Sequence, residues 1–264
     1  QPFLYTDRKL RDRLATFAAT TGEPEAWTAL KPRTFLIDAL DDISRAGTPA
    51  EVSPDQTAFI QFSSGSTREP KGVVLTHRNI LANAEGARQA AGFCEQDISL
   101  SWMPLTHDMG LIGFHLCMFA ANIEHTIMDT RLFSRRPLLW LEEASRIGAT
   151  LLSSPNFGYK HFLKMYESKG LDGLDLSRVR LLFNGAEPIS VALCRRFMQE
   201  MQRFGLPASA MYPVYGLAEA SLAVTLPDRG QPFRAVTVAR ASLAVGRAPV
   251  AAAAAATGDL ELMV

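Results

Sequence analysis

Residues 63–72 combine four hydroxyl side chains, two glycines and one lysine in a stretch of ten residues. Backbone N–H groups of a Gly-rich turn and short hydroxyls donate to phosphate oxygens, and a nearby lysine offsets part of the charge. A Walker A loop is excluded, because five residues separate Gly65 from Lys71 and the next residues predict a strand. The alternative is a solvated hairpin of Ser and Gly residues. The composition favours a phosphate-binding loop, with the binding residues Ser63, Ser64, Gly65, Ser66, Thr67 and Lys71.

Three further polar segments follow predicted strands and could share a site with this loop; they are residues 106–110, 184–188 and 215–219. Tyr215 offers an aromatic face to a purine ring, and Gly216 would let a ligand approach the backbone closely. Glu219 supplies a hard carboxylate, the type of ligand that holds a partly hydrated Mg²⁺. Taken singly, Tyr215 is equally explained as a core residue and Glu219 as a solvated helix cap.

Side chains in or beside these segments could supply the remaining groups of a binding site. His107 could place a hydrogen bond or partial positive charge beside a developing anion, although a lone histidine is as often structural. The backbone that begins at Asn184 could bind a purine edge, or form a plain strand-to-helix turn with Pro188 near the helix start. Large apolar residues could form a slot for an acyl chain, although core packing explains them equally well; they are Trp102, Met103, Met109, Phe157 and Tyr159.

The elements that would position these residues indicate an α/β protein. Beyond about residue 53, short β-rich runs alternate with helical patterns, which is typical of a parallel sheet with crossover helices. The expected strands are residues 57–62, 73–75, 98–103, 149–153, 180–183 and 209–214. The expected helices are residues 79–91, 135–147, 157–168 and 189–204. Because ligands bind beyond the carboxyl ends of parallel strands, the four polar loops are predicted to form one site.

Five motifs, in this order, resemble the adenylate-forming superfamily of acyl-CoA synthetases, luciferases, peptide-synthetase adenylation domains and fatty acyl-AMP ligases. They are residues 62–77, 101–113, 153–157, 183–188 and 215–221, and the similarity covers residues 55 to 246. The His-Asp-Met-Gly sequence at residues 107–110 is similar to fatty acyl-AMP ligases, and residues 224–246 resemble the start of that subfamily's insertion. The resemblance implies the large amino-terminal α/β domain of this fold, with mostly parallel sheets flanked by helices.

The resemblance also implies a reaction. A fatty acid would be activated by ATP to acyl-AMP with release of pyrophosphate, and the acyl group would pass to the phosphopantetheine thiol of a carrier protein. Lys71 and His107 would be catalytic, Glu219 would hold Mg²⁺, and Trp102, Met109 and Phe157 would contact the acyl chain. The implied nucleotide-binding residues beyond the phosphate loop are Asn184, Gly185, Ala186, Glu187, Tyr215 and Gly216. An acyl-CoA synthetase and a catalytically silent nucleotide- or acyl-binding module stay open as alternatives.

Some parts of the superfamily pattern have no counterpart in this sequence. The phosphate loop begins early, so part of the amino-terminal lobe is expected to be absent, as is the mobile carboxy-terminal domain, and the chain alone is expected to be poorly active. Residues 257–259 resemble the superfamily's ribose-binding motif. Asp259 lies too close to Glu219 in the sequence for that role to be assigned. The predicted division is a partial lobe or connecting segment at 1–52, a nucleotide- and acyl-binding core at 53–246 and a poorly defined tail at 247–264, with six consecutive alanines at 251–256.

The composition limits the remaining possibilities. The chain has 264 residues, 47% of them apolar, and its 27 basic and 27 acidic side chains balance without the basic stripe that nucleic-acid binding requires. Three cysteines without C-x-x-C spacing fit reduced thiols in the cytosol. No apolar stretch approaches the roughly 20 residues that span a bilayer. We therefore expect a cytoplasmic protein that binds no nucleic acid and does not span a membrane.

Overall fold

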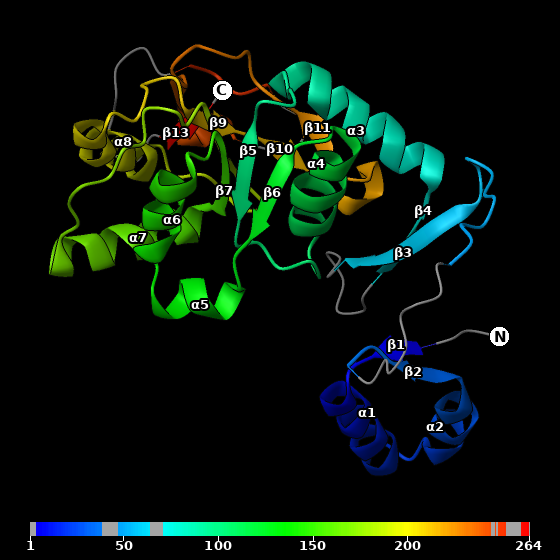
Figure 1. Cartoon of the computed structure of the whole chain (residues 1–264). Helices are drawn as coiled ribbons and strands as arrows, with labels where there is room; N and C mark the ends of the chain where they lie inside the picture. The colour runs from blue at the N-terminus through cyan, green and yellow to red at the C-terminus, as the bar shows by residue number, and fades with distance from the viewer. Residues whose placement is uncertain are drawn as a thin grey trace. The chain divides into compact units, whose positions relative to one another are not determined.

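The computed structural model describes residues 4–38, 47–63, 71–243, 246, 248–251 and 260–263 (Figure 1). The chain divides into two compact units, residues 1–52 and 53–264. In the first unit, β1 (Leu4–Thr6) and β2 (Thr34–Leu36) pair in parallel, and α1 (Arg8–Thr20), α2 (Pro24–Leu30) and η1 (Lys31–Arg33) connect them. The carboxylate of Asp7 accepts a hydrogen bond from Leu10 N at 2.6 Å, so α1 begins at a side-chain cap.

A five-stranded parallel sheet forms the centre of the second unit and confirms the predicted α/β class. Its strands are β5 (Ile98–Ser101), β6 (Glu124–Ile127), β7 (Leu151–Pro155), β8 (Leu181–Gly185) and β9 (Met211–Pro213), in the order β6-β5-β7-β8-β9. Leu100, Leu152, Leu182 and Met211 form one row across the sheet, and each is at most 1% exposed. A sheet covered on both faces explains why β7 and β8 are buried along their whole length, with their serine and asparagine side chains inside the protein.

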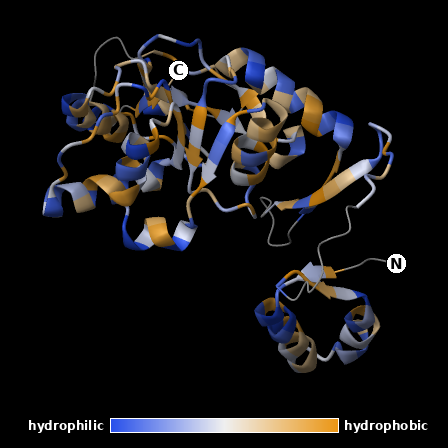
Figure 2. Cartoon of the chain, viewed as in Figure 1, coloured by the Kyte–Doolittle hydropathy of each residue, from blue (hydrophilic) through white to orange (hydrophobic). Residues whose placement is uncertain are grey.

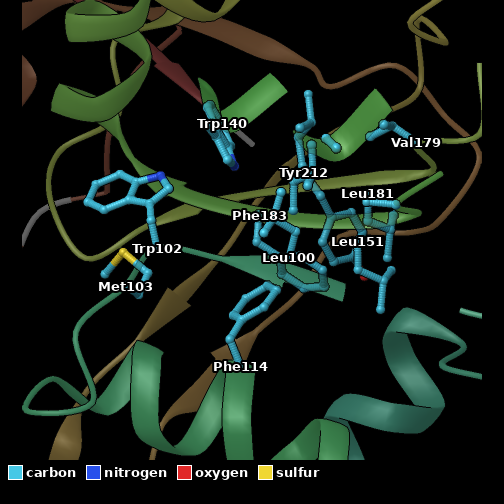
Figure 3. Packing of buried hydrophobic residues seen from close by; sticks show 14 of the residues in the cluster. Leu100, Trp102, Met103, Phe114, Trp140, Leu151, Val179, Leu181, Phe183 and Tyr212 are labelled. Carbon is cyan, nitrogen blue, oxygen red and sulfur yellow. The ribbon is translucent and has the colours of Figure 1, made fainter. Parts of the chain in front are cut away.

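Helices cover both faces of this sheet (Figure 1). One face carries α3 (His77–Ala91), the π-helical η2 (Met109–Leu116) and α4 (Cys117–Ala120), and the other carries α6 (Leu139–Ile147), α7 (Asn156–Lys169) and α8 (Val191–Met201). Figure 3 shows Phe114 of η2 directed toward Phe183 from one side and Trp140 of α6 on the other. The expected helix at residues 79–91 is found as α3, with Ile80, Ala84, Ala87 and Ala91 as its buried side.

Two expectations about individual elements are wrong in detail. The single helix expected at 135–147 is two helices, α5 (Thr130–Arg135) and α6, with Pro137 between them, because proline cannot donate the hydrogen bond that a continuous helix needs. The strand β4 (Lys71–Thr76) pairs antiparallel with β3 (Thr57–Ser63), so this hairpin is not part of the parallel sheet. The edge strand β6 was not predicted, because its sequence Glu-His-Thr-Ile is polar and half exposed.

The remaining elements follow the sheet. β10 (Tyr215–Gly216) and β11 (Ala223–Thr225) form a short antiparallel hairpin around η4 (Ala218–Ala220), and β12 (Ala235–Val238) pairs antiparallel with β13 (Leu260–Met263). Two short helices, η3 (Gln202–Phe204) and η5 (Arg240–Ser242), complete the described elements. Hydrophobic residues occur in the central sheet and on the helices that cover it, whereas the edge strand β6 is largely hydrophilic (Figure 2). Among the described residues, no helix is long and apolar enough to cross a membrane.

Candidate functional site

The carboxyl edge of the parallel sheet brings together three of the four predicted loops. The loop at 106–110 follows β5, the loop at 184–188 follows β8, and the loop at 215–219 follows β9. Because β5, β7, β8 and β9 are parallel, these loops leave the sheet on the same side. This edge is therefore the candidate site.

The predicted phosphate loop belongs to the β3–β4 hairpin instead of the parallel sheet. Ser63 and Lys71 are partners in its register, and the residues between them, including Ser64, Gly65, Ser66 and Thr67, lie outside the described residues. The hairpin is nevertheless connected to the site, because β3 packs against η4, the turn that carries Glu219. Ser63 Oγ is buried and has no hydrogen-bond partner among the described residues, so it retains a free polar atom at the base of the loop.

A cavity of about 70 Å³ joins the three loops at the carboxyl edge. The loops contribute Asp108 and Met109, Ala186, and Tyr215 with Gly216. The rest of the wall is almost entirely apolar and consists of Ala87, Phe93, Gly113, Phe114, Cys117, Phe183, Val214, Leu222, Ala223 and Leu226. An apolar cavity with one carboxylate beside it suits a ligand with a hydrocarbon part and a polar end.

His107 and Asp108 form an ion pair next to this cavity. His107 Nδ1 lies 2.8 Å from Asp108 Oδ1, which also accepts a hydrogen bond from Met109 N at 2.7 Å. Met109 N lies farther from His107 Nδ1, at 3.2 Å. We therefore assign the N–H of Met109 as a donor to the carboxylate of Asp108. The Nδ1–H of His107 then donates to the same carboxylate. The hydrogen bond to Asp108 raises the pKa of His107, and its effect exceeds that of partial burial. Burial opposes ionisation of Asp108, but the hydrogen bond and charge of His107 lower the pKa of Asp108 overall.

One hydrogen bond attaches the loop at 184–188 to the start of α7, and a second attaches Ser190, the residue before α8. The carboxylate of Glu187 accepts one from Phe157 N, and Asn156 Oδ1 accepts one from Ser190 N at 3.0 Å. Pro155 precedes α7 and gives it no side-chain cap, so Glu187 acts as the missing cap from another part of the chain. The side chain of Glu187 is thus a structural connection, and only its backbone remains for a nucleotide.

Three other residues of this loop have unusual environments. Asn184 is fully buried, and its amide nitrogen lies 3.3 Å from Cys194 Sγ, so the side chain points into the core. Its Oδ1 has no partner among the described residues. Ala186 has a φ of 70°, in the left-handed region that a residue with a Cβ adopts only under constraint. Gly185 could not carry a side chain, because a Cβ there would lie 2.9 Å from the carbonyl oxygen of Val214.

The three predicted acyl-binding residues occupy different environments. Met109 lines the cavity. Trp102 is 2% exposed and stacks on Phe133 with a centroid separation of 3.8 Å, which is core packing and not cavity lining. Phe157 is 54% exposed and packs its ring edge-on against Trp102 at 5.7 Å. Only Met109 is therefore placed directly at the apolar space.

The turn that follows β9 presents one aromatic ring and one carboxylate to solvent. Tyr215 is 59% exposed. Glu219 is exposed, and its carboxylate has no hydrogen bond or ion pair among the described residues. The structure gives Gly216 a packing role, because a Cβ there would lie 2.1 Å from the carbonyl oxygen of Leu222 across the hairpin.

Asn83 of α3 holds this turn in place and was missed by the sequence analysis. Its amide nitrogen donates to Ala220 O at 3.2 Å and to Ala223 O at 2.8 Å, and its oxygen accepts from Ala223 N at 2.9 Å. The available signal was a polar residue directly before Ala84 on the buried side of an otherwise regular helix. Asp108 was also not predicted as a site residue. It lies within the motif at residues 101–113 and is the carboxylate that lines the cavity.

The carboxyl edge fits a nucleotide with its magnesium ion. No group of three or more His, Cys, Asp or Glu residues that could enclose a metal occurs in the part of the chain that the structure describes. A single free carboxylate such as Glu219 suits Mg²⁺, which commonly keeps several waters and takes its other ligands from phosphates. The exposed ring of Tyr215 is available to the base, and Ser63, at the end of β3, has a buried Oγ without a partner among the described residues.

An open parallel sheet with a polar, partly strained carboxyl edge is the arrangement at which α/β domains bind their ligands, nucleotides among them. Comparison with known proteins makes this specific: the model of the family described as AMP-binding enzyme matches residues 7–251. The chain therefore belongs to the AMP-binding enzyme family. This membership confirms the resemblance to adenylate-forming enzymes.

The similar proteins include ligases that act on fatty acids. A long-chain-fatty-acid–AMP ligase of Mycolicibacterium smegmatis is 40% identical over 227 residues, which cover 82% of this chain and 35% of that protein. A medium-chain-fatty-acid–[acyl-carrier-protein] ligase of Moorena producens is 35% identical over 205 residues, covering 78% of this chain and 35% of that protein. The crystal structure of a fatty acyl-adenylate ligase from L. pneumophila, in complex with acyl adenylate and pyrophosphate, has a TM-score of 0.80 and 34% identity, over 87% of this chain and 40% of that one. The chain thus spans about a third of the length of these relatives.

Proposed function

We propose that this chain is the nucleotide- and acyl-binding part of a fatty acyl-AMP ligase. The reaction is attack of a fatty-acid carboxylate on the α-phosphorus of ATP, which forms the acyl-AMP anhydride and releases pyrophosphate. The acyl group then passes to the phosphopantetheine thiol of a carrier protein. The observation that carries the proposal is the apolar cavity whose wall includes Asp108, Ala186 and Tyr215 from three loops of one sheet edge. The similarity to fatty acid ligases supports it.

The proposed roles follow from the environment of each side chain. Tyr215 stacks its exposed ring on adenine, and the backbone of residues 185–187 contacts the edge of the base. Ser63, Lys71 and the loop between them bind the β- and γ-phosphates. Glu219 holds Mg²⁺, which neutralises phosphate charge and leaves the protein to position the reactants.

The acyl chain enters the apolar cavity past Met109, and the carboxylate stays near His107. Because Asp108 raises the pKa of His107, the imidazole keeps its positive charge over a wider pH range. A cation at this position would attract the substrate carboxylate and stabilise negative charge that develops during transfer. Phe157 borders the site and Trp102 supports it from the core.

Exchange of labelled pyrophosphate into ATP, dependent on added fatty acid, tests the adenylation step in the complete protein that carries this chain. Glu219→Gln should reduce exchange at least a hundredfold, because the neutral amide is a much weaker Mg²⁺ ligand. Glu95→Gln, an exposed glutamate outside the site, is the matched control and should leave exchange unchanged. Full exchange activity in Glu219→Gln would remove this residue from the metal site.

The acceptor is tested by supplying acid, ATP, coenzyme A and a holo-carrier protein together. Accumulation of acyl-carrier without acyl-CoA is the expected result. Abundant acyl-CoA would instead assign the protein to the acyl-CoA synthetases. Absence of pyrophosphate exchange with every fatty acid tried, together with nucleotide binding, would point to a catalytically silent module.

A further inference from the structure

An exposed positive surface lies outside the candidate site, along α7 and the end of α5. It consists of five basic side chains, each exposed and without an ion pair among the described residues: Arg135, Arg136, Lys160, Lys164 and Lys169. The buried side of α7 carries Tyr159, Phe162, Leu163 and Tyr166. The exposed side contains Phe157, Lys160 and Lys164 at helical spacing, so these residues form one stripe. We call these five side chains the basic surface.

Contacts between α5 and α7 place the two arginines beside this stripe. His161 Nε2 lies 2.9 Å from the carbonyl oxygen of Ser134, and the rings of Phe133 and His161 are 6.0 Å apart. Arg135 and Arg136 directly follow Ser134. Figure 1 shows α5 and α7 as neighbours, and the free end of α7 is hydrophilic in Figure 2. The basic surface therefore draws its side chains from two elements that contact each other.

Acidic side chains on these elements are already neutralised. Asp129 binds Arg131 at 3.0 Å, and Glu167 of α7 is paired with Arg196 of α8. The chain as a whole has 27 basic and 27 acidic side chains, so a local excess of five positive charges is not a consequence of its net charge. Such an excess attracts a negatively charged partner and speeds its association.

The exposed stripe of α7 that carries Lys160 and Lys164 begins at Phe157, next to the loop at 184–188. Phe157 is the first exposed residue of α7. Its backbone N–H donates a hydrogen bond to the carboxylate of Glu187, which connects it to the loop at 184–188. From Phe157 to Lys169 the helix is about 18 Å long. A partner bound along α7 would therefore lie within reach of the site for a flexible arm.

We infer that the basic surface docks an acidic face of the carrier protein that receives the acyl group. The inference rests on the proposed function. A protein partner fits better than an anionic membrane, because an interfacial helix must insert an apolar face, and the apolar face of α7 is packed in the core. Bound here, the carrier could direct its thiol arm past Phe157 toward the acyl adenylate.

Charge reversal on the basic surface tests the inference in the complete protein. Two double variants are made, Arg135→Glu/Arg136→Glu and Lys160→Glu/Lys164→Glu, with Lys9→Glu as control, an exposed lysine of α1 that has no ion pair among the described residues. Acyl transfer is measured with the holo-carrier and with free pantetheine, which has the thiol arm and no protein surface. Each double variant should raise KM for the carrier at least tenfold and leave pyrophosphate exchange and transfer to pantetheine unchanged. Lys9→Glu should change none of them.

Two further measurements separate docking from other causes. The carrier KM of the wild type should rise with salt, whereas that of the variants should respond much less. A carrier in which acidic surface residues are replaced by lysine should recover transfer with the variants. Wild-type KM values in both double variants, or equal losses with carrier and pantetheine, would overturn the inference. So would variants that lose binding to vesicles of anionic lipid while loading the carrier normally. If the wild type exchanges pyrophosphate and loads no carrier at all, the proposed function fails instead.

Discussion

The two edges of the parallel sheet differ in how their polar groups are satisfied. At the amino-terminal edge, Asp97, Thr150 and Arg180 stand immediately before β5, β7 and β8 and bind one another. Asp97 Oδ1 accepts from Arg180 Nε and from Thr150 Oγ1, each at 2.7 Å. At the carboxyl edge, Asn184 Oδ1 is buried without a partner among the described residues, and Ala186 has a left-handed φ.

This contrast separates stability from function within one sheet. Arg180 also donates to the carbonyl oxygens of Ala91 and Gly92, so it closes the end of α3 as well as the start of the strands. Strained backbone and unpaired polar atoms at the opposite edge persist because the surrounding fold holds them there. Substitutions at the amino-terminal edge should therefore change stability, and those at the carboxyl edge should change binding.

The largest effect is expected from Arg180→Met. This change leaves the 2% exposed carboxylate of Asp97 without its partner, and removal of one member of a buried ion pair costs about 3–5 kcal/mol. Urea unfolding measures the loss, while KM for ATP of the folded enzyme should stay unchanged. Arg195→Met, which breaks an exposed pair with Glu261, is the control and should cost below about 1 kcal/mol. Equal losses in the two variants would refute the special role of the amino-terminal edge.

The same edge should respond to acid. Burial alone would raise the pKa of Asp97, but hydrogen bonds from Arg180, Thr150 and Cys94 and the charge of Arg180 lower it overall. A carboxyl with a lowered folded pKa stabilises the protein above its unfolded pKa of about 3.9. This contribution is lost as the pH falls through the folded pKa, and it should be missing from Arg180→Met.

The second effect concerns the carboxyl edge and Asn83→Ala. This change removes three hydrogen bonds to the turn around Glu219, each with a net contribution of about 1 kcal/mol. The free energy of unfolding should therefore fall by roughly 2–3 kcal/mol. Unlike Arg180→Met, this variant should also lose pyrophosphate exchange at temperatures where it is fully folded, because η4 carries the metal ligand. Asn83→Asp keeps the acceptor for Ala223 N and should be intermediate. Normal exchange in folded Asn83→Ala would show that the turn holds its position without the clamp.

Much of this arrangement could be predicted from the sequence, and the exceptions have physical reasons. The stripe Ile80, Ala84, Ala87 and Ala91 identified α3 because burial follows helical periodicity. The same reasoning missed Asn83, because its side-chain amide binds backbone groups that lie 137 and 140 residues away in the sequence. It also counted Trp102 as acyl-binding, because an aromatic residue beside a motif gives no sign of whether its ring faces the core or a cavity.

The third effect tests the connection between the loop at 184–188 and α7. Glu187→Ala removes the cap of Phe157 N, which should cost about 1 kcal/mol of stability. It should also raise KM for ATP and for fatty acid together, because the cap joins the predicted adenine loop to a residue bordering the acyl site. Glu187→Gln keeps an acceptor oxygen and should largely restore both. A change in KM for ATP alone would mean that the carboxylate contacts the nucleotide directly.

The smallest effect is expected from Asp108→Asn, which removes the charge beside His107 but keeps an acceptor for Met109 N. The pKa of His107 should fall, because the hydrogen bond that His107 donates to the Asp108 carboxylate is the main cause of its elevation. NMR titration of the imidazole measures this. His125, whose pKa burial lowers to about 4, should titrate identically in both proteins and serves as the internal reference.

The same pair should contribute to stability within a limited pH window. A histidine with a raised folded pKa stabilises the protein below its unfolded pKa of about 6.5, and this contribution is lost as the pH rises through the folded pKa. Asp108, with a lowered pKa, contributes only above about 3.9. The wild type should therefore exceed Asp108→Asn in stability mainly between about pH 4 and 6.5, by less than about 1 kcal/mol because His107 is 45% exposed. A difference that persists unchanged at pH 9 would show that the negative charge of Asp108 acts by strengthening the hydrogen bond from Met109 N and not through the charge of His107.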